Sequence, residues 1–186
     1  MEVTDTSIKG LKVIRPRVFE DARGYFYESF NEREFAEKVC PGIRFVQDNQ
    51  SRSCRGVVRG LHFQKPPFAQ SKLVRVVEGA VLDVAVDLRA GSPTYGKYEA
   101  VELSADNKLQ LFIPKGFAHG FAVLSEVAVF QYKCDAFYHP EAEDALAWND
   151  PDIAVQWPFS AADALLSAKD TASQSKLFRE FETPFR

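Results

Sequence analysis

The chain has 186 residues, of which 46% are hydrophobic and 26% charged, which suits one folded domain with a substantial core and excludes a disordered chain. Its net charge is −3 and its pI is near 5.7, so it lacks the basic excess of proteins that bind nucleic acids or anionic membranes. We expect a single domain over residues 1–186, in which a few placed cations hold any anionic ligand.

The cellular compartment is indicated by the cysteines and the N-terminus. Cys40, Cys54 and Cys134 are an odd number without C-x-x-C spacing, which favours free thiols in a reducing cytosol. The opening MEVTDTSIKG lacks the basic and apolar regions of a signal peptide. AVLDVAVDL, an apolar run, is interrupted by two aspartates and is too short to span a membrane. We expect a cytoplasmic protein without a membrane segment.

The first predicted helix lies in SFNEREFAEKV, residues 29–39. Asn31 is a suitable N-cap, and Glu34 stands at the capping-box position three residues later. Phe30 and Phe35 have the spacing of a hydrophobic staple. The CPG sequence at 40–42 ends the helix.

From about residue 43 to residue 134 the sequence changes to a strand pattern, with turn signals such as Glu78-Gly79 between short β-branched or aromatic runs. The runs are IRFVQDNQS (43–51), GVVRGLHFQ (56–64), SKLVRVVEGAVLDVAVDL (71–88), KYEAVELS (97–104), KLQLFIP (108–114) and VAVFQYK (127–133). Since no helical segments separate them, these runs predict an antiparallel sandwich or barrel.

The C-terminal part is expected to be helical. Ser160 is a candidate cap for a helix over 161–167, and Asp170 is a candidate cap for one over 171–181. The predicted fold class is therefore mainly β, an antiparallel β-barrel with short flanking helices.

Polar residues on strands are the candidates for a site, because inward positions of a barrel face either the core or a ligand cavity. Alternation places Gln47, Asn49 and Ser51 on one face of their strand. Arg59 and His62 interrupt GVVRGLHFQ, which otherwise reads as core.

Each further candidate also has a plain structural interpretation. Lys72, like Arg59, is by itself most simply a solvated cation, and Tyr132 a core aromatic with its hydroxyl at the surface. Asp170 is, on local grounds, a helix cap. If these residues meet around His62, they supply metal-free acid–base chemistry: a histidine base, a carboxylate that orients it, a tyrosine acid and a cation.

Two motifs resemble the signatures of the cupin family: G-x5-H ending at His62, and P-x-G-x-x-H ending at His119. Metal-binding cupins follow the first histidine with a second one two residues later and a nearby glutamate. Here Gln64 occupies that position, and residues 65–71 contain no carboxylate. Since zinc, iron and manganese require three or four ligands, we expect a cupin-type barrel without a metal or another cofactor.

Eight segments together, in order and with matching spacing, closely resemble the dTDP-4-dehydrorhamnose 3,5-epimerase family from about residue 3 to residue 180. They are RGYFYESF, FVQDNQS, VVRGLHFQ, QSKLVRVVEGAVLDVAVDLR, PTYGKY, IPKGFAHGF, YKCDAFYHPEAE and LSAKD. The resemblance implies a cupin-type jelly roll and a homodimer whose N-terminal segments reach the neighbouring subunit.

The implied activity is inversion of C3 and C5 in a dTDP-linked 4-keto-6-deoxyhexose, dTDP-4-dehydro-6-deoxy-D-glucose, to give dTDP-4-dehydro-L-rhamnose. One alternative is an epimerase of antibiotic-sugar biosynthesis that inverts only C3 or only C5. A second is a sugar-nucleotide-binding cupin without catalysis, which the presence of His62, Tyr132 and Asp170 argues against. A metallo-cupin oxygenase is disfavoured by Gln64.

The resemblance also implies roles for individual residues. His62 matches the family's base, Asp170 its partner, Tyr132 the acid on the opposite side of the sugar, and Lys72 the cation beside the C4 oxygen. Tyr138 matches the aromatic residue that stacks on thymine. The other implied substrate-binding residues are Arg23, Phe26, Glu28, Gln47, Asp48, Asn49, Arg59, His119, Glu143 and Lys169.

The spacing of Arg59 and His62 conflicts with this set of roles. Strict alternation puts their side chains on opposite faces of the strand. Gly60, which lies between them, is therefore predicted to form a β-bulge that turns one of the two.

Overall fold

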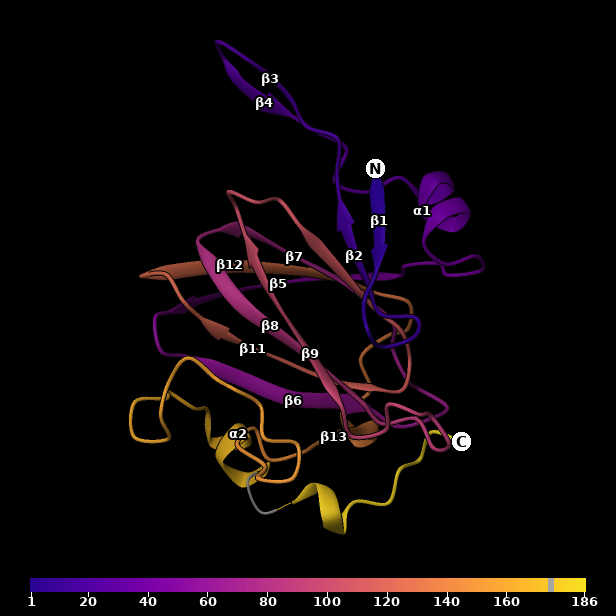
Figure 1. Ribbon diagram of the computed structural model, residues 1–186, viewed down its shortest axis with the longest axis vertical. Helices are drawn as coiled ribbons and strands as arrows, with labels where there is room; N and C mark the ends of the chain where they lie inside the picture. Colours follow the sequence, from indigo (N-terminus) through magenta and orange to yellow (C-terminus); the bar gives the residue numbers. More distant parts are fainter. Residues whose placement is uncertain (174–175) are drawn as a thin grey trace.

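The computed structural model describes residues 1–173 and 176–186 (Figure 1). Its strands are β1 (Glu2–Asp5), β2 (Lys12–Arg15), β3 (Phe19–Asp21), β4 (Gly24–Phe26), β5 (Gln47–Cys54), β6 (Val58–Gln64), β7 (Lys72–Glu78), β8 (Ala80–Asp87), β9 (Tyr98–Ser104), β10 (Gln110–Ile113), β11 (Phe117–Val123), β12 (Val127–Cys134) and β13 (Glu143–Ala145). The helices are α1 (Glu32–Lys38) and α2 (Ala168–Ser173), and 3₁₀ turns span Pro140–Ala142 and Phe178–Glu180.

Two antiparallel sheets face each other. The first has the strand order β1-β2-β10-β7-β12-β5, and the second has the order β13-β6-β11-β8-β9. Strands distant in sequence lie side by side, as when β10 pairs with β2 and with β7, which is typical of a jelly roll. The predicted cupin-type antiparallel β fold is confirmed.

The main core lies between the two sheets. Val74 and Phe130 from the first sheet pack against Val81 and Phe121 from the second. The rings of Phe121 and Phe130 stack with their centroids 4.3 Å apart. Burying each such side chain contributes about 1.5–3 kcal/mol, so the inward apolar positions hold the sheets together.

Helix α1 covers the outer face of the first sheet. The Phe35 ring meets the Phe112 ring at a centroid distance of 5.2 Å and the Phe30 ring at 5.8 Å. Asn31 Oδ1 accepts a hydrogen bond from the Glu34 backbone N–H, as predicted for the cap. The Glu34 carboxylate contacts the Lys38 ammonium group on the next turn.

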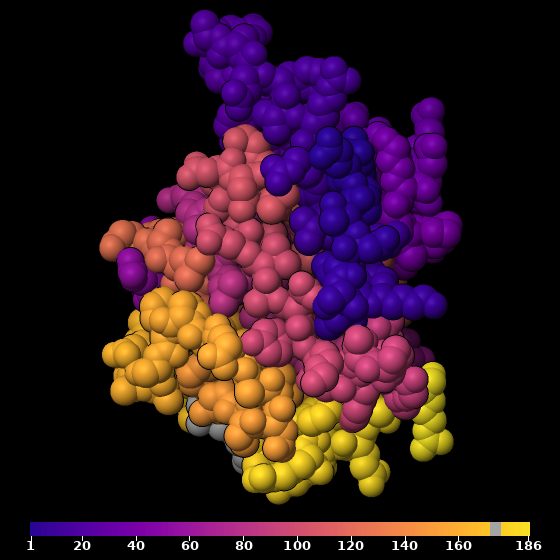
Figure 2. All heavy atoms as spheres, viewed as in Figure 1, coloured from indigo at the N-terminus to yellow at the C-terminus, as the bar shows by residue number. Residues whose placement is uncertain are grey.

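The C-terminal segment covers the outer face of the second sheet and lies below β6 and β13 in Figure 1. Its anchor is aromatic, because Phe63 of β6 contacts both Phe181 and Phe185. Figure 2 shows this yellow C-terminal segment at the opposite end of the molecule from the indigo N-terminal arm.

The two predicted C-terminal helices were wrong in their extent. Residues 161–163 form a turn, and Leu165 forms a β-bridge, because Leu165 N donates to Gly56 O and Leu165 O accepts from Val58 N. No helix forms over 161–167. Over 171–181 the structure has the end of α2, which begins earlier at Ala168, and a separate 3₁₀ turn at Phe178–Glu180. Residues 174–175 of that predicted helix lie outside the described residues.

The strand predictions hold better. The strand expected from residue 43 begins at Gln47, and the long run 71–88 divides into β7 and β8 at Gly79. Gly79 has a φ of +74°, and an added Cβ would lie 2.0 Å from Val127 O. Only glycine fits this turn, so the turn signal was interpreted correctly.

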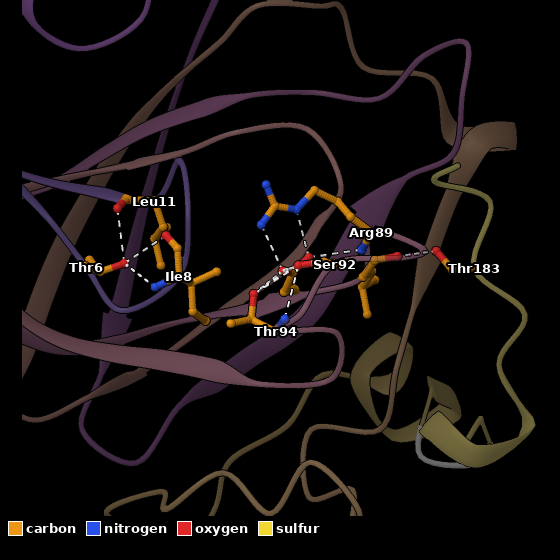
Figure 3. Close-up of polar contacts among 9 residues, drawn as sticks. Thr6, Ile8, Leu11, Arg89, Ser92, Thr94 and Thr183 are labelled. Carbon is orange, nitrogen blue, oxygen red and sulfur yellow. Dashed lines mark hydrogen bonds and ion pairs between the residues drawn. The ribbon is translucent and has the colours of Figure 1, made fainter.

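The loop after β8 is fixed by a buried carboxylate. Asp87 accepts hydrogen bonds from the Arg89 guanidinium at 2.8 Å and from the Ser92 and Thr94 hydroxyls at 2.6 Å. Figure 3 shows Arg89, Ser92 and Thr94 converging on this point. Burial raises the pKa of Asp87, but the hydrogen bonds from Arg89, Ser92 and Thr94 outweigh it and lower the pKa to about 2.

Strands β3 and β4 form an arm, residues 19–26, that projects away from the sandwich (Figures 1 and 2). Phe26 is 68% exposed, and Phe19 and Tyr25 are also exposed. So much exposed aromatic surface on a projecting hairpin is typical of an interaction segment.

In the described part of the chain, no helix has the length and apolar character needed to cross a membrane.

Candidate active site

A cavity of about 460 Å³ lies between the two sheets and contains most of the predicted site residues. Those that line it are Gln47, Asn49, Arg59, His62, Lys72, His119, Tyr132, Tyr138, Glu143, Lys169 and Asp170. Ser51, placed by alternation on the face of Gln47 and Asn49, also lines it. A second hollow of about 430 Å³, on the outer face of the first sheet, lacks the histidines and is not the candidate site.

His62 and Asp170 form a pair within this cavity. His62 Nε2 lies 2.6 Å from Asp170 Oδ1, and the Asp170 side chain is almost fully buried. Burial raises the pKa of Asp170, but hydrogen bonds from His62 and Ser167 outweigh it and lower the pKa to about 2. The carboxylate is therefore ionised at neutral pH and can orient the imidazole and stabilise its protonated form.

The prediction that Asp170 is an N-cap was wrong. Ser167 holds that position, because its hydroxyl accepts a hydrogen bond from Asp170 N and its carbonyl accepts one from Thr171 N. The Asp170 carboxylate lies in the first turn of α2 and accepts hydrogen bonds from the Ser167 hydroxyl at 2.6 Å and from Gly60 N at 3.2 Å. The first turn of α2 thus delivers the carboxylate to β6.

The predicted bulge in β6 is present at Gly60. Residues His62 and Arg59 pair with His119 and Phe121 of β11, so two residues of β6 oppose only one of β11. The extra residue brings Arg59 and His62 to the same cavity, although strict alternation would separate them. Gly60 has a φ of +137°, and a Cβ added there would lie 2.5 Å from the Cα of Gly120.

Tyr132 and Lys72 enter the cavity from the other sheet, on β12 and β7. Burial raises the pKa of Tyr132 to about 12, so the phenol stays protonated at neutral pH. The Lys72 Nζ lies 5.7 Å from the centroid of the Tyr132 ring. Burial lowers the pKa of Lys72, and the nearby Cys134, Asp83 and Glu143 oppose that shift.

Sequence reasoning missed Asp83, which makes a second histidine–carboxylate pair. The His119 Nε2 lies 2.9 Å from Asp83 Oδ2, and Asp83 is fully buried. Burial lowers the pKa of His119, while Asp83 opposes this shift. The available signal was an aspartate in the apolar strand AVLDVAV, where a buried carboxylate requires a partner.

The rim of the cavity is formed by a linked set of polar groups. The Tyr138 hydroxyl donates a 2.6 Å hydrogen bond to Glu143, which also forms an ion pair with Lys169. Gln47 Nε2 donates to Asn49 Oδ1 at 3.0 Å. Burial raises the pKa of Glu143, but the hydrogen bonds from Lys169 and Tyr138 outweigh it, so the net pKa is lowered.

Four expected substrate-binding residues lie outside this cavity within the chain. Arg23 and Phe26 are on the β3–β4 arm, where Arg23 forms an ion pair with Asp21. Glu28 lies beside Asn31 at the start of α1, and Asp48 faces outward from β5 toward Lys133. Asp48 points outward because it alternates with Gln47 and Asn49.

A metal ion would need several donor side chains of the cavity to converge on one point. Among residues 1–173 and 176–186, no group of three or more His, Cys, Asp or Glu side chains is placed to hold a metal ion. The chemistry that the cavity offers is that of two carboxylate-paired histidines, a protonated phenol and a buried amine.

Comparison with known proteins gives a consistent result. The model of the family described as dTDP-4-dehydrorhamnose 3,5-epimerase matches residues 5–177. The chain is 54% identical over 170 residues to the Escherichia coli (strain K12) protein of that name, with 91% of each chain covered.

Two solved structures are similarly close. The dTDP-4-dehydrorhamnose 3,5-epimerase from Elizabethkingia anophelis NUHP1 has a TM-score of 0.90 and 52% identity, with 97% of each chain covered. The dTDP-6-deoxy-D-glucose-3,5-epimerase from Legionella pneumophila, solved in complex with dTDP-4-keto-L-rhamnose, has a TM-score of 0.92 and 49% identity, covering 97% of this chain and 94% of that one.

Proposed function

This chain belongs to the dTDP-4-dehydrorhamnose 3,5-epimerase family, and from that premise we propose how its own residues carry out the reaction. It is an isomerase that inverts C3 and C5 of dTDP-4-dehydro-6-deoxy-D-glucose to give dTDP-4-dehydro-L-rhamnose. The hydrogens on C3 and C5 are both acidic, because each of these carbons is adjacent to the C4 ketone. The protein therefore has to remove a proton, stabilise the enolate and return a proton to the opposite face.

His62 is the base in this proposal. Asp170 contacts its Nε2 and keeps a proton there, so the lone pair on Nδ1 accepts the proton from C3 or C5. The imidazolium formed in this step is stabilised by the ionised Asp170 carboxylate. The bulge at Gly60 aims the ring into the cavity.

Lys72 and Tyr132 complete the reaction. The Lys72 ammonium group stabilises the negative charge on the C4 oxygen of the enolate, and this stabilisation is strong in a cavity with little water. Tyr132 then donates its phenolic proton to the face opposite His62, which inverts the centre. The observation that carries the proposal is that an aspartate-paired histidine on β6 and a protonated phenol on β12, in opposite sheets, line one cavity.

The remaining cavity residues bind the nucleotide part of the substrate. Tyr138 stacks on the thymine base, and the polar residues of the rim, together with Arg59 and His119, hold the sugar and the diphosphate. Support comes from their common position at the cavity and from the dTDP-linked ligand in the related Legionella structure.

We also propose a homodimer and a cytoplasmic location. In the dimer the β3–β4 arm brings Arg23 and Phe26 to the cavity of the neighbouring subunit, with Glu28 at the base of the arm. The exposed aromatic side chains of the arm support this arrangement.

The cytoplasmic location is supported by the cysteines, because the free thiols of Cys40, Cys54 and Cys134 fit a reducing compartment. We propose that residues 1–186 form one domain, in keeping with the family match over 5–177.

The function is tested by incubating the protein with dTDP-4-dehydro-6-deoxy-D-glucose and assigning the product by NMR. Inversion at both C3 and C5 is the expected result. Inversion at one centre would make the protein a single-centre epimerase, and tight binding without conversion would make it a sugar-nucleotide-binding protein.

A further inference from the structure

The main chain around Tyr138 is held by two glutamines from opposite sheets. Gln47 of β5 accepts a hydrogen bond from Tyr138 N at 2.9 Å. Gln64 of β6 donates to the carbonyl of Phe137 at 3.2 Å. The peptide bond that joins Phe137 to Tyr138 is thus held at both its N–H and its C=O, once by each sheet.

Gln64 also holds the next peptide. Its Oε1 accepts a 2.7 Å hydrogen bond from His139 N, and its Nε2 donates a 2.6 Å hydrogen bond to Phe68 O on the preceding loop. Only 4% of Gln64 is exposed, and both oxygen and nitrogen of its amide bind main-chain groups. One side chain therefore joins the loop at 65–70 to the backbone on both sides of Tyr138.

Tyr138 itself is half exposed at the mouth of the cavity. An exposed ring on a loop ordinarily samples several positions, and ordering it on binding costs free energy. Here the backbone that carries the ring is fixed before the ligand arrives, and its hydroxyl is bound to Glu143. The ring is thereby preorganised for a planar group.

We propose that Gln64 is a positioning residue for the nucleobase: it fixes the backbone at Tyr138 so that the ring is ready to stack on a pyrimidine. This inference rests on the proposed function, in which Tyr138 contacts the thymine of the substrate. Gln64 stands two residues after His62, where metal-binding cupins have a second histidine. In this proposal its side chain serves recognition of the nucleotide instead.

The test uses the full-length protein and the volume-matched variant Gln64→Met, together with Tyr138→Ala and the double variant. For each, the Kd of dTDP is measured by calorimetry, and kcat and KM are measured with the dTDP-4-keto sugar. Stacking of a base on an aromatic ring contributes enough for Tyr138→Ala to raise the Kd about tenfold. Gln64→Met should raise Kd and KM by about three- to tenfold, with kcat changed less than about twofold.

The double variant separates positioning from a general structural role. If Gln64 acts through the ring, Gln64→Met adds less than about a twofold further loss of dTDP affinity when Tyr138 is already alanine. Gln156→Met is the matched control, because the Gln156 amide donates to a backbone carbonyl, that of Ala154, in an exposed loop. This control should leave Kd, KM and kcat unchanged.

The inference is overturned if Gln64→Met leaves the Kd of dTDP unchanged, if it lowers kcat as much as it raises KM, or if its effect persists fully in the Tyr138→Ala background. It is also overturned if Tyr138→Ala binds dTDP normally. Should Gln64→Met melt below the assay temperature, Gln64→Glu is measured instead, since it keeps the acceptor for His139 N and loses both donors. Failure of the wild-type protein to epimerise would count against the proposed function, and normal binding of dTDP by Tyr138→Ala would count against stacking on Tyr138. The comparisons of Gln64→Met with the wild type and with the double variant count against Gln64 alone.

Discussion

At the scale of single residues, the cavity shifts the pKa values of two acidic groups, Asp170 and Tyr132, in opposite directions. Hydrogen bonds overcome the effect of burial and lower the pKa of Asp170 to about 2, while burial raises the pKa of Tyr132 to about 12. At neutral pH one is a carboxylate that supports the base and the other is a protonated phenol. In the proposed mechanism, this separation of the two pKa values suits Asp170 as the partner of the base and Tyr132 as the proton donor.

Asp170→Asn tests the first of these assignments. Asp170 Oδ1 contacts both Gly60 N and His62 Nε2, so the amide oxygen of an asparagine can keep both contacts, but the side chain no longer carries the negative charge that stabilises the protonated imidazole. We expect turnover to fall by about 10²–10⁴-fold, with a folded protein as judged by circular dichroism and a thermal melt. Near-normal turnover would show that the pair serves only the structure of α2.

The residue types at the centre of the site were predictable, but not their contacts. His62, Lys72 and Tyr132 stand out because they place functional groups on strands. Asp83 was missed because its partner, His119, lies 36 residues away on β11. The partner of a buried carboxylate is set by strand pairing, which no local pattern encodes.

At the scale of elements, the bulge in β6 decides which side chains reach the cavity. Gly60→Ala should separate β6 from β11, because the new Cβ would lie 2.5 Å from the Cα of Gly120. We expect a drop of several degrees in the melting temperature and a loss of turnover, since the His62 ring is displaced. Gly24→Ala is the control for the melt: its φ of +128° imposes similar backbone strain, but no atom lies within 4 Å of the added Cβ. Equal losses of stability in the two variants would contradict a role for the close approach.

The loop after β8 gives a prediction about pH. The pKa of Asp87 is lowered from 3.8 to about 2, so its contribution to stability is complete above about pH 4 and is lost as the pH falls toward 2. Asp87→Asn should lower the free energy of unfolding at pH 7 by about 1–2 kcal/mol, after allowance for solvent screening. Urea melts from pH 7 to pH 2 should show the difference between variant and wild type shrinking below pH 4. A difference that is constant with pH would rule out the carboxylate charge as its source.

Most elements were predictable where local signals and tertiary contacts agree. The short β-branched or aromatic runs at β6 to β10 and at β12 and the cap at Asn31 predicted strands and α1 correctly, because each element buries side chains that its sequence marks as apolar. Strand β11 (Phe117–Val123) was not among the predicted strands. The C-terminal part was mispredicted because Leu165 pairs with Gly56 and Val58, and these contacts override the helical propensity of 161–167.

At the scale of the whole molecule, the cavity and the projecting arm are separate within one chain. Arg23 and Phe26 lie on the arm, away from the cavity that holds His62. In the proposed symmetric dimer, each arm would reach the neighbouring cavity and bring these groups together. The resemblance implies N-terminal segments that reach the neighbouring subunit, and the arm is the part of the N-terminal segment that we propose plays this role.

Mixing two inactive variants tests this exchange. His62→Ala removes the base from one subunit, and an Arg23→Ala, Phe26→Ala chain supplies a defective arm. In a heterodimer, the intact arm of the His62→Ala subunit reaches the intact cavity of the other subunit. Random reassembly should therefore restore about a quarter of the wild-type activity. If the mixture stays as inactive as its components while sedimentation shows heterodimers, each arm serves its own subunit or neither.

The central claim is that His62 removes the proton and Tyr132 returns one from the other side. Its most direct test is incubation of dTDP-4-dehydro-6-deoxy-D-glucose in D₂O with the wild-type protein, His62→Ala and Tyr132→Phe, with deuterium located by NMR. We predict label at C3 and C5 with the wild type and none with His62→Ala. With Tyr132→Phe, we predict exchange into the substrate while the inverted product falls by about 10²–10⁴-fold. Exchange at the wild-type rate in His62→Ala would contradict the account, because another residue would then have to be the base.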